Sequence, residues 1–235
     1  MKPTLIVTRP DPQGPLFAAT IRQAWPGPLD VILSPLLRIV PVPVADNLTR
    51  IGGVIFTSVN GVAQAARLGL PKGCLAFCVG AQTQKAAADV GFETVTGPGN
   101  ATELTALILR RGAIGPLAHI RGHHARGDIA ATLTSAGVAC RDVIAYDQQA
   151  QSLHTAAKTA LDGIGPVVVP LFSARTSTIF QQQGPFAAPL HLIAISAAAV
   201  PSDMTVRTIA IATAPNGPAM VAATIACLRD LAQQG

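Results

Sequence analysis

The sequence has few aromatic residues and little charge. Aromatic residues make up 4% of its 235 residues and charged residues 12%, whereas hydrophobic residues make up 49%. Few rings are therefore available to stack on bases, which argues against nucleic-acid binding of that kind. Valine, isoleucine, leucine and alanine must fill the core, and there are enough of them for one large α/β domain or two small ones.

Long runs of basic residues are also missing. The net charge is +5 and the pI is about 9.4, yet only Arg110 and Arg111 are adjacent arginines. Scattered arginines suit a small anionic ligand better than a long phosphate backbone, so we expect no nucleic-acid partner.

Cysteine and histidine do not form the spacings of a metal site. His123 and His124 are expected to be a solvated turn pair, because no further ligands accompany them. Four-residue spacing in an apolar run places Cys74 and Cys78 on one face of a strand. We expect buried, reduced thiols at all four cysteines and no metal: Cys74, Cys78, Cys140 and Cys227.

No apolar run approaches the roughly 20 residues of a membrane span. The chain begins with an apolar strand, Thr4 to Thr8, and not with a basic segment followed by an apolar one. We therefore expect a soluble cytoplasmic protein with no membrane partner. Since no apolar surface stripe stands out, we expect a monomer.

Common catalytic signatures are absent too. There is no Cys–His pair, GxSxG, paired carboxylates, P-loop or GxGxxG after a strand. What is present is VIFTSVNGV, Val54 to Val62, an apolar strand that runs into a polar turn and a helix. Hydroxyls and free backbone N–H groups at such a turn suit an anionic group. A similar segment recurs at Pro170 to Phe180, and Phe172 follows Phe56 by 116 residues.

Strands and helices alternate along most of the chain, which predicts parallel sheets with right-handed crossovers. The expected strands are 4–8, 31–35, 53–58, 74–79, 93–96, 117–121, 166–172, 190–195 and 207–212. The expected helices are 12–25, 60–69, 81–90, 102–111, 125–136, 154–162, 174–183, a short one at 197–201, and 216–232.

The offset of 116 residues holds in three strand–turn–helix units, which indicates an internal repeat. It pairs Phe56 with Phe172, Val79 with Ile195, Gly80 with Ser196 and Asn100 with Asn216. We predict an α/β protein of two similar flavodoxin-like domains, each a parallel sheet flanked by helices. One domain comprises 1–36 plus 150–235 and the other 40–143. The extended segments 36–43 and 140–150 are expected to form a two-stranded linker.

In open parallel sheets, ligands bind beyond the carboxyl ends of the strands. We expect these ends of both domains to face one cleft that holds an anion, because its turns are rich in hydroxyls and nearly free of carboxylates. The candidate substrate-binding residues are Arg9, Thr57, Ser58, Asn60, Gly80, Arg121, Ser173, Ala174, Arg175, Ser196 and Asn216.

Each candidate also has a purely structural interpretation. Thr57 and Ser58 can serve only as helix caps, and Asn100 and Asn216 are expected to be caps. Arginines 9, 38 and 175 can be surface charges. His119 is expected in the core or at an edge. Tyr146, the only tyrosine, lies in the expected linker facing the cleft, either as a packing residue or as a hydrogen-bond donor.

Seven segments form an ordered set along the chain. They are LIVTRP (5–10), FTSVNGV (56–62), VGAQTQKAAADVGF (79–92), IRG (120–122), SAGVACRDVIAYDQ (135–148), FSARTSTIF (172–180) and IATAPNG (211–217). In order and spacing this set resembles the uroporphyrinogen-III synthase family over nearly the whole chain. The resemblance implies two α/β domains joined by a two-stranded linker, in agreement with the prediction from the residues.

The resemblance also implies a cofactor-independent lyase of tetrapyrrole biosynthesis, on the route to haem, cobalamin and chlorophyll. Its substrate is hydroxymethylbilane, a linear tetrapyrrole with many carboxylates, and its products are uroporphyrinogen III and water. Tyr146 corresponds to the tyrosine proposed to assist loss of the hydroxyl. Gln84, Ser196 and Arg175 depart from the family pattern.

Two other functions are compatible with the residues. One is a non-catalytic two-domain binding protein for a small polyanionic ligand, against which the missing leader segment argues. The other is a flavodoxin-like signalling module without ligand chemistry, against which the repeated polar turns argue.

Overall fold

The computed structural model describes residues 1–45, 47–70, 73–112, 115–124 and 127–234. The chain divides into two compact units. Unit 1 comprises Met1–Arg38 and Gln149–Gly235, and unit 2 comprises Ile39–Gln148.

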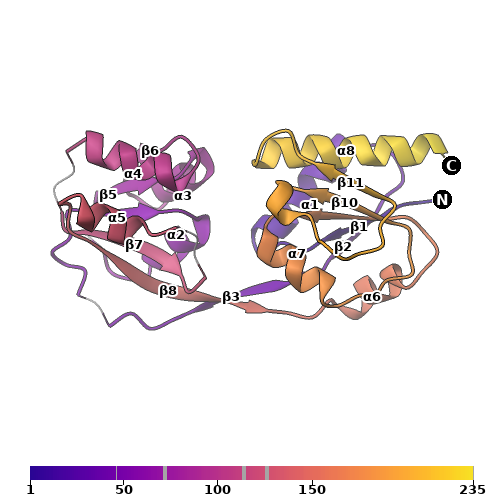
Figure 1. Cartoon of the computed structure of the whole chain (residues 1–235), viewed down its shortest axis with the longest axis horizontal. Helices are drawn as coiled ribbons and strands as arrows, with labels where there is room; N and C mark the ends of the chain where they lie inside the picture. The colour runs from indigo at the N-terminus through magenta and orange to yellow at the C-terminus, as the bar shows by residue number, and fades with distance from the viewer. Residues whose placement is uncertain (46, 71–72, 113–114, 125–126, 235) are drawn as a thin grey trace. The chain divides into compact units, whose positions relative to one another are not determined.

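Unit 1 is a five-stranded parallel sheet with helices on both faces (Figure 1). Its strands are β1 (Thr4–Val7), β2 (Asp30–Leu33), β9 (Val167–Leu171), β10 (Leu190–Ala194) and β11 (Thr208–Ile211). Its helices are α1 (Gln13–Ala24), α6 (Thr155–Leu161), α7 (Ala174–Gln181), the 3-10 turn η1 (Ala197–Ala199) and α8 (Gly217–Gln234).

Unit 2 carries a second sheet, which is six-stranded and also flanked by helices (Figure 1). Its strands are β3 (Leu37–Pro41), β4 (Gly53–Phe56), β5 (Leu75–Cys78), β6 (Glu93–Thr96), β7 (Leu117–Gly122) and β8 (Cys140–Ala150). Its helices are α2 (Val59–Ala65), α3 (Ala81–Asp89), α4 (Ala101–Arg110) and α5 (Ile129–Ser135).

The two sheets have the same order of corresponding strands. Unit 1 runs β2-β1-β9-β10-β11, which is the flavodoxin order 2-1-3-4-5. Unit 2 runs β8-β7-β4-β5-β6, with β3 added beyond β8. This is the same order if counting starts at β7, so unit 2 is a circular permutation of unit 1. The internal repeat in the sequence thus corresponds to a repeated sheet.

The central strands of each sheet are buried on both faces, as strands of parallel sheets usually are. In unit 2, Val54 and Phe56 pack with α2 and α3, whereas Ile55 packs on the other face with α4 and α5. In unit 1, Val169 and Leu171 pack with α6 and α7, and Val168 with α1 and α8. Side chains alternate between faces along a strand, so fully apolar strands supply two cores at once.

The predicted fold class is confirmed, and all the predicted elements are present with shifted ends. The helix expected at 60–69 ends at Ala65, because turns follow and Gly69 adopts a positive φ of 62°. The helix expected at 125–136 begins at Ile129, and its expected start at 125–126 lies outside the described residues.

The segment 140–150 is more than a linker. Its residues Cys140–Tyr146 pair in parallel with β7, and it also neighbours β3. The N–H of Val42 donates to the oxygen of Ala145, and the N–H of Gln151 to that of Leu36, which is an antiparallel pattern. The edge position of β3 accommodates Pro41, because a proline cannot donate to a further strand.

The expectation of four buried cysteines is wrong for three of them. All four are free, but only Cys78 is buried, whereas Cys74, Cys140 and Cys227 are half-buried. Cys74 precedes β5 and so lies outside the fully covered part of the sheet. Within the described part of the chain, no helix is both long and apolar enough to cross a membrane.

Candidate functional site

The place where strand order reverses is where ligands bind in open α/β sheets, beyond the carboxyl ends of the strands. In unit 2 this point lies between β4 and β7, and in unit 1 between β9 and β1. Thr57 and Ser58 follow β4, and Arg121 lies near the end of β7. Ser173 and Arg9 hold the corresponding places in unit 1. The topology therefore assembles candidates from distant parts of the sequence at one edge of each sheet.

In unit 2 a chain of polar contacts begins at the Thr57 hydroxyl. Thr57 Oγ1 lies 3.2 Å from His119 Nε2, and His119 Nδ1 lies 2.9 Å from Asp142 Oδ1. Arg121 donates from Nη1 to Asp142 Oδ2 at 3.1 Å. A hydroxyl, an imidazole, a carboxylate and a guanidinium are thus connected across the neighbouring strands β4, β7 and β8.

Strand register explains this chain. His119 lies opposite Ile55 on one side and opposite Asp142 on the other. Residues two apart on a strand share a face, so Thr57 lies on the face of Ile55 and one step further along. His119 is therefore flanked by Thr57 and Asp142 as a consequence of pairing. The sequence alone does not reveal the register of β8 on β7.

Burial controls the charge of His119. Its side chain is 1% exposed, and burial, joined by the nearby Arg121 charge, lowers its pKa from the ordinary value. Asp142 opposes this effect through its hydrogen bond and its charge. Because burial is the largest contribution, the imidazole is neutral at neutral pH. The expectation that His119 lies in the core is correct, but it describes only part of its environment.

Tyr146 lies in the core of unit 2, at 3% exposure. A bulge shifts the β7–β8 register so that Tyr146 faces Gly122. Its phenol hydrogen-bonds to the Ser58 side chain and the Gly122 backbone, and burial raises its pKa. The expectation that Tyr146 lies in a linker is therefore wrong, because β8 continues the sheet through this residue.

Glycine at two positions makes this edge of unit 2 compact. A Cβ on Gly122 would lie 2.5 Å from Tyr146 Cε2, and one on Gly61 would lie 2.7 Å from the oxygen of Ile120. Both distances are shorter than real Cβ contacts allow. Gly80 is different, because its nearest neighbour would be the Cα of Gly99 at 3.7 Å. Packing within unit 2 thus requires Gly61 and Gly122 but leaves room at Gly80.

Thr57 and Ser58 have different hydrogen-bond partners, and only Ser58 caps a helix. Ser58 is the N-cap of α2, and its Oγ accepts from the N–H of Asn60 at 3.1 Å. The Thr57 hydroxyl has His119 as its partner, so capping does not account for it. Asn100 and Asn216 are caps as expected, accepting from the N–H groups of Glu103 and Ala219.

In unit 1, the guanidinium of Arg9 lies over an aromatic ring. Its Cζ is 4.1 Å from the ring centroid of Phe172, which contacts Phe17 edge-on at 5.0 Å. Burial lowers the pKa of Arg9. Among the described residues, Arg9 forms no ion pair with a carboxylate. A half-buried cation held by stacking suits an anionic ligand, since stacking leaves its N–H groups directed outward from the ring edge.

The other unit 1 candidates lie at the same edge of that sheet. Ser173 is the N-cap of α7, and its Oγ accepts from the N–H of Thr176 at 3.1 Å. Ala174 and Arg175 begin α7 and are half-buried. Ser196 precedes η1 without a side-chain cap bond. Unit 1 therefore brings small polar groups and two arginines together, and the cleft expected between the two domains stays a prediction.

Two residues of this part of unit 2 are not predicted from the sequence. Asp142 is not a candidate there, because the candidates lie in turns after strands, whereas Asp142 lies inside β8. Gly122 appears there only as part of a motif. One sequence feature could have indicated Asp142. His119 and Arg121 lie two residues apart on one strand, so they share a face, and a carboxylate on the adjacent strand would pair with both.

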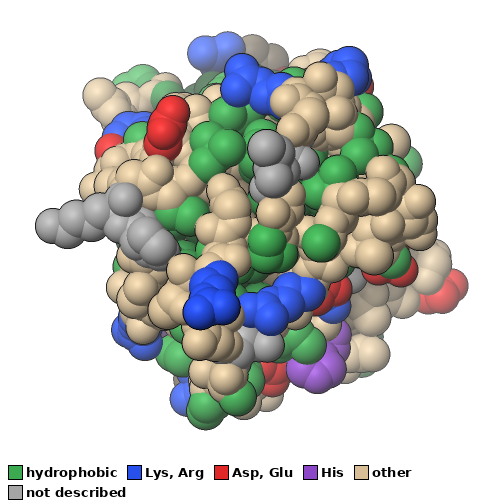
Figure 2. Space-filling view, turned by 90° about the vertical axis from the view of Figure 1, so that its left-hand side faces the viewer, with side chains coloured by type: hydrophobic (Ala, Val, Ile, Leu, Met, Phe, Trp, Pro, Cys, Tyr) green, Lys and Arg blue, Asp and Glu red, His purple; other side chains and the backbone are tan. Residues whose placement is uncertain are grey.

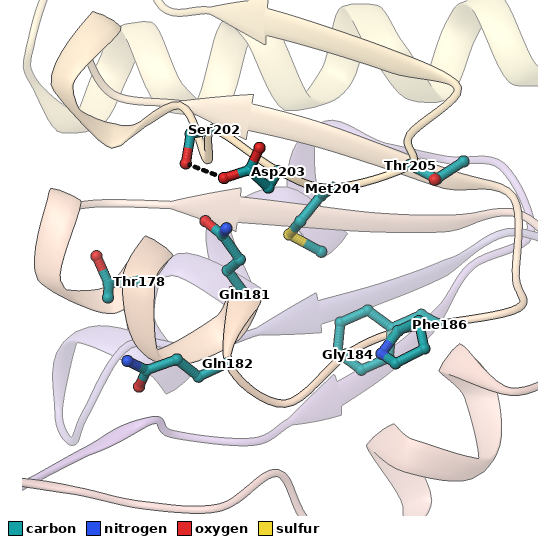
Figure 3. A pocket seen from close by; sticks show the side chains of 10 residues that line it. Thr178, Gln181, Gln182, Gly184, Phe186, Ser202, Asp203, Met204 and Thr205 are labelled. Atoms are coloured by element: carbon teal, nitrogen blue, oxygen red, sulfur yellow. Dashed lines mark hydrogen bonds between the residues drawn. The ribbon is translucent and has the colours of Figure 1, made fainter.

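A cavity of about 610 Å³ lies elsewhere in unit 1 (Figure 3). In the close-up, Thr178, Gln181 and Gln182 come from α7 and the turn after it, facing Ser202, Asp203 and Met204. This is the opposite end of α7 from its cap, Ser173. Neutral amides with one carboxylate do not suit a polyanion, so chemistry favours the strand ends over this cavity.

Basic side chains are dispersed over one face of unit 2. On the face of unit 2 seen in Figure 2, Lys and Arg side chains form separate groups among hydrophobic and uncharged side chains. The described residues contain no group of three or more His, Cys, Asp or Glu side chains arranged to hold a metal ion. His123 and His124 are exposed, as expected for a turn pair.

Comparisons with known proteins point to one family. The family model described as uroporphyrinogen-III synthase HemD matches residues 21–222. A uroporphyrinogen-III synthetase structure from Helicobacter pylori superposes with a TM-score of 0.66 at 15% identity, covering 97% of this chain and all of that one. A mutant uroporphyrinogen III synthase from Thermus thermophilus, an extremely thermophilic bacterium, gives 0.54 at 11%, covering both chains fully. No curated protein sequence matches.

Proposed function

The chain belongs to the uroporphyrinogen-III synthase family, and we propose that it converts hydroxymethylbilane to uroporphyrinogen III and water. The family match over residues 21–222 carries this proposal. The fold shared with the synthetase from Helicobacter pylori supports it over nearly the full length. The product is the precursor of haem, cobalamin and chlorophyll, so the chain would act in tetrapyrrole biosynthesis.

The reaction needs a fixed substrate conformation more than strong acid–base groups. Loss of the hydroxymethyl oxygen as water, with one added proton, leaves an azafulvene cation. The substituted carbon of ring D attacks this cation and forms a spiro intermediate, which fragments and closes again with ring D inverted. The linear substrate also closes by itself without inversion. The protein must therefore hold the chain so that the substituted carbon is the nearer nucleophile.

Tyr146 is the proposed donor to the departing hydroxyl. Its raised pKa keeps the phenol protonated at neutral pH, so it donates a hydrogen bond and does not act as a phenolate. The bonds to Ser58 and the Gly122 backbone orient the hydroxyl. A buried phenol reaches only a group that enters the edge next to Ser58. We therefore expect Tyr146→Phe to reduce the rate without abolishing it.

The arginines are the proposed partners of the substrate carboxylates. Arg9 is held by Phe172 and forms no ion pair among the described residues, whereas Arg121 already donates to Asp142. Arg9 is thus the stronger candidate of the two. Around it in unit 1, Ser173, Arg175, Ser196 and Asn216 are proposed as further contacts. In unit 2 these are Thr57, Ser58, Asn60 and Gly80.

One assay tests the proposed function. Freshly prepared hydroxymethylbilane is incubated with the full chain, the products are oxidised, and the porphyrin isomers are separated. Isomer III above the background of the reaction without protein supports the synthase. Isomer I alone, with a measurable affinity for the bilane, would favour the non-catalytic binding protein instead.

A further inference from the structure

We propose that His119 and Asp142 fix the Thr57 hydroxyl as a hydrogen-bond acceptor, so that Thr57 holds a pyrrole N–H of the substrate and not a carboxylate. The assignment of a pyrrole rests on the proposed function. It changes the part played by Thr57, which the sequence alone assigns to anion binding. His119 and Asp142 are positioning residues, because they act through Thr57.

The Asp142 carboxylate sets the direction of each hydrogen bond in the series from Asp142 through His119 to Thr57. The Asp142 carboxylate only accepts, and it takes a bond from Arg121 at 3.1 Å and one from His119 Nδ1 at 2.9 Å. Nδ1 must therefore carry the imidazole proton. In a neutral ring Nε2 is then bare and accepts, so the hydroxyl 3.2 Å away must donate to it.

This leaves the Thr57 oxygen with lone pairs only. A hydroxyl has one proton, and that proton points into the sheet toward His119. A substrate carboxylate at Thr57 would place lone pairs against lone pairs. A pyrrole N–H is a donor without acceptor capacity, so it matches this oxygen. The bilane carries such a group on every ring, and holding one of them fixes the orientation of that ring.

The groups around His119 keep its imidazole neutral at neutral pH. The ionisable groups facing it are Asp142 from β8, Arg121 from β7 and, next to its backbone, the Cys140 thiol. Burial lowers the pKa of His119, and burial raises that of Cys140 to about 11, so neither group is charged at neutral pH. Protonation of Nε2 in acid would reverse the bond and release the Thr57 proton outward.

The first test needs no substrate. Two-bond proton–nitrogen correlation spectra of the full chain labelled with 15N-histidine report which ring nitrogen carries hydrogen, and His119→Gln assigns the signal among the five histidines. We expect the Nδ1–H tautomer near neutral pH. The Nε2–H tautomer, or a charged ring, would overturn the inference and leave the synthase proposal standing.

The second test is a double-mutant cycle with hydroxymethylbilane. In Asp142→Asn the amide donates to Nδ1, which forces the proton to Nε2 and turns the Thr57 hydroxyl outward. We expect KM to rise roughly 5- to 100-fold with a smaller change in kcat, because a donor now faces a donor. Thr57→Val, which keeps the shape, should raise KM about 3- to 10-fold.

The double variant, with both Thr57→Val and Asp142→Asn, tests whether Asp142 acts through Thr57. In the Thr57→Val background, Asp142→Asn should raise KM at least about 3-fold less than it does in the wild-type background, because the hydroxyl it inverts is gone. Loss of the Arg121 ion pair occurs in both backgrounds and so cancels. Additive effects would mean that Asp142 acts independently of Thr57, and the inference would fail.

The matched control is His191→Gln. His191 is the other buried histidine, with Nδ1 2.9 Å from Thr208 Oγ1, and it lies in unit 1. Its substitution should leave KM unchanged within about 2-fold. If the wild-type chain gives only isomer I, the proposed function fails, whereas the tautomer result still stands or falls by itself.

Discussion

The two polar turns differ in what lies behind them, although their backbones repeat. In unit 2 the first hydroxyl, Thr57, contacts a buried imidazole that is paired with a carboxylate. In unit 1 the corresponding hydroxyl, Ser173, contacts the Thr176 hydroxyl and backbone of its own helix. One turn is thus connected to ionisable groups of neighbouring strands, and the other is closed locally.

A shift of one residue explains the difference. The N-cap is Ser58 in unit 2 but Ser173 in unit 1, which corresponds to Thr57. Because Ser58 takes over capping, Thr57 is released to point across the sheet. Continuing the β1–β9 register places Thr8, not a histidine, at the place of His119. The same fold therefore presents a hydrogen-bond acceptor, Thr57, in unit 2. In unit 1 it presents a helix cap, Ser173, at the same sheet edge as Arg9.

The largest expected effect is the loss of stability when the phenylalanine before each turn, Phe56 or Phe172, is replaced by alanine. Phe56 is fully buried and contacts Phe92 at 5.2 Å, so Phe56→Ala should destabilise unit 2 by about 3–5 kcal/mol. Phe172 is half-buried, so Phe172→Ala should cost unit 1 only about 1–2 kcal/mol, while also releasing Arg9.

The chain offers a separate optical probe for each unit. Its one tryptophan, Trp25, lies in unit 1, and its one tyrosine, Tyr146, lies in unit 2. Urea unfolding followed by Trp25 fluorescence and Tyr146 absorbance should therefore resolve which unit each substitution affects. Equal shifts of both transitions in Phe56→Ala would contradict the assignment of that residue to unit 2 alone.

A smaller effect tests how closely each helix approaches its sheet. Gly61 in α2 has no room for a Cβ, whereas the residue 116 positions later, Ser177 in α7, already carries one. Gly61→Ser should destabilise unit 2 by about 1–3 kcal/mol. Ser177→Ala should be neutral or stabilise by up to about 1 kcal/mol, because its buried Oγ has no hydrogen-bond partner among the described residues.

Denaturant midpoints for these two variants give the measurement. Gly80→Ala is the matched control, because its Cβ would lie 3.7 Å from its nearest neighbour. A loss of stability in Ser177→Ala comparable to that of Gly61→Ser would mean that the Ser177 hydroxyl stabilises unit 1, which would contradict the prediction for this variant.

Acid should weaken unit 2 through His119. Its pKa in the folded chain lies below the ordinary value of about 6.5, so below that pH the unfolded chain takes up a proton that the folded chain does not. Stability should therefore fall as pH drops from about 6.5, by up to about 1.4 kcal/mol per unit, until the folded pKa is reached. His119→Gln should remove this slope from the Tyr146 transition.

The comparison to make is wild type against His119→Gln at each pH. An identical slope in both would mean that His119 is charged in the folded chain, contrary to its burial. His191, whose pKa burial also lowers, contributes only to the Trp25 transition of unit 1.

The smallest expected effects concern the caps. Ser58→Ala and Ser173→Ala each remove a cap bond and should cost about 0.5–2 kcal/mol in their own unit. Ser173→Ala should be the larger, since Ser173 also contacts the Thr176 hydroxyl. Thr57→Val should cost less than either, and a loss as large as that of Ser58→Ala would mean that Thr57 shares in capping.

The sequence was sufficient to predict the fold because its signals are local. Apolar strands, intervening helices and the offset of 116 residues predict two doubly wound sheets without any knowledge of pairing. The end of β8 was harder, because an extended polar segment such as 140–150 can be a linker or an edge strand. Its pairing with β7 shows that it is a strand of the sheet, and the residues of the segment alone do not predict that pairing.

The site was predicted in part for the same reason. Thr57, Ser58 and Ser173 follow strands, so they could be identified from their positions. The contact of Thr57 with His119 depends on register between β4 and β7, which are separated by two intervening strands in the sequence. Asp142 depends on a second register, and the burial of Tyr146 on a bulge. These are tertiary facts that no local pattern contains.

The isomer composition of the porphyrin formed from hydroxymethylbilane tests the account most directly. The proposed function predicts isomer III as the main product with wild type, and more isomer I as Thr57→Val loosens the hold on the ring. Isomer I alone with the wild-type chain, at every protein concentration, would contradict it.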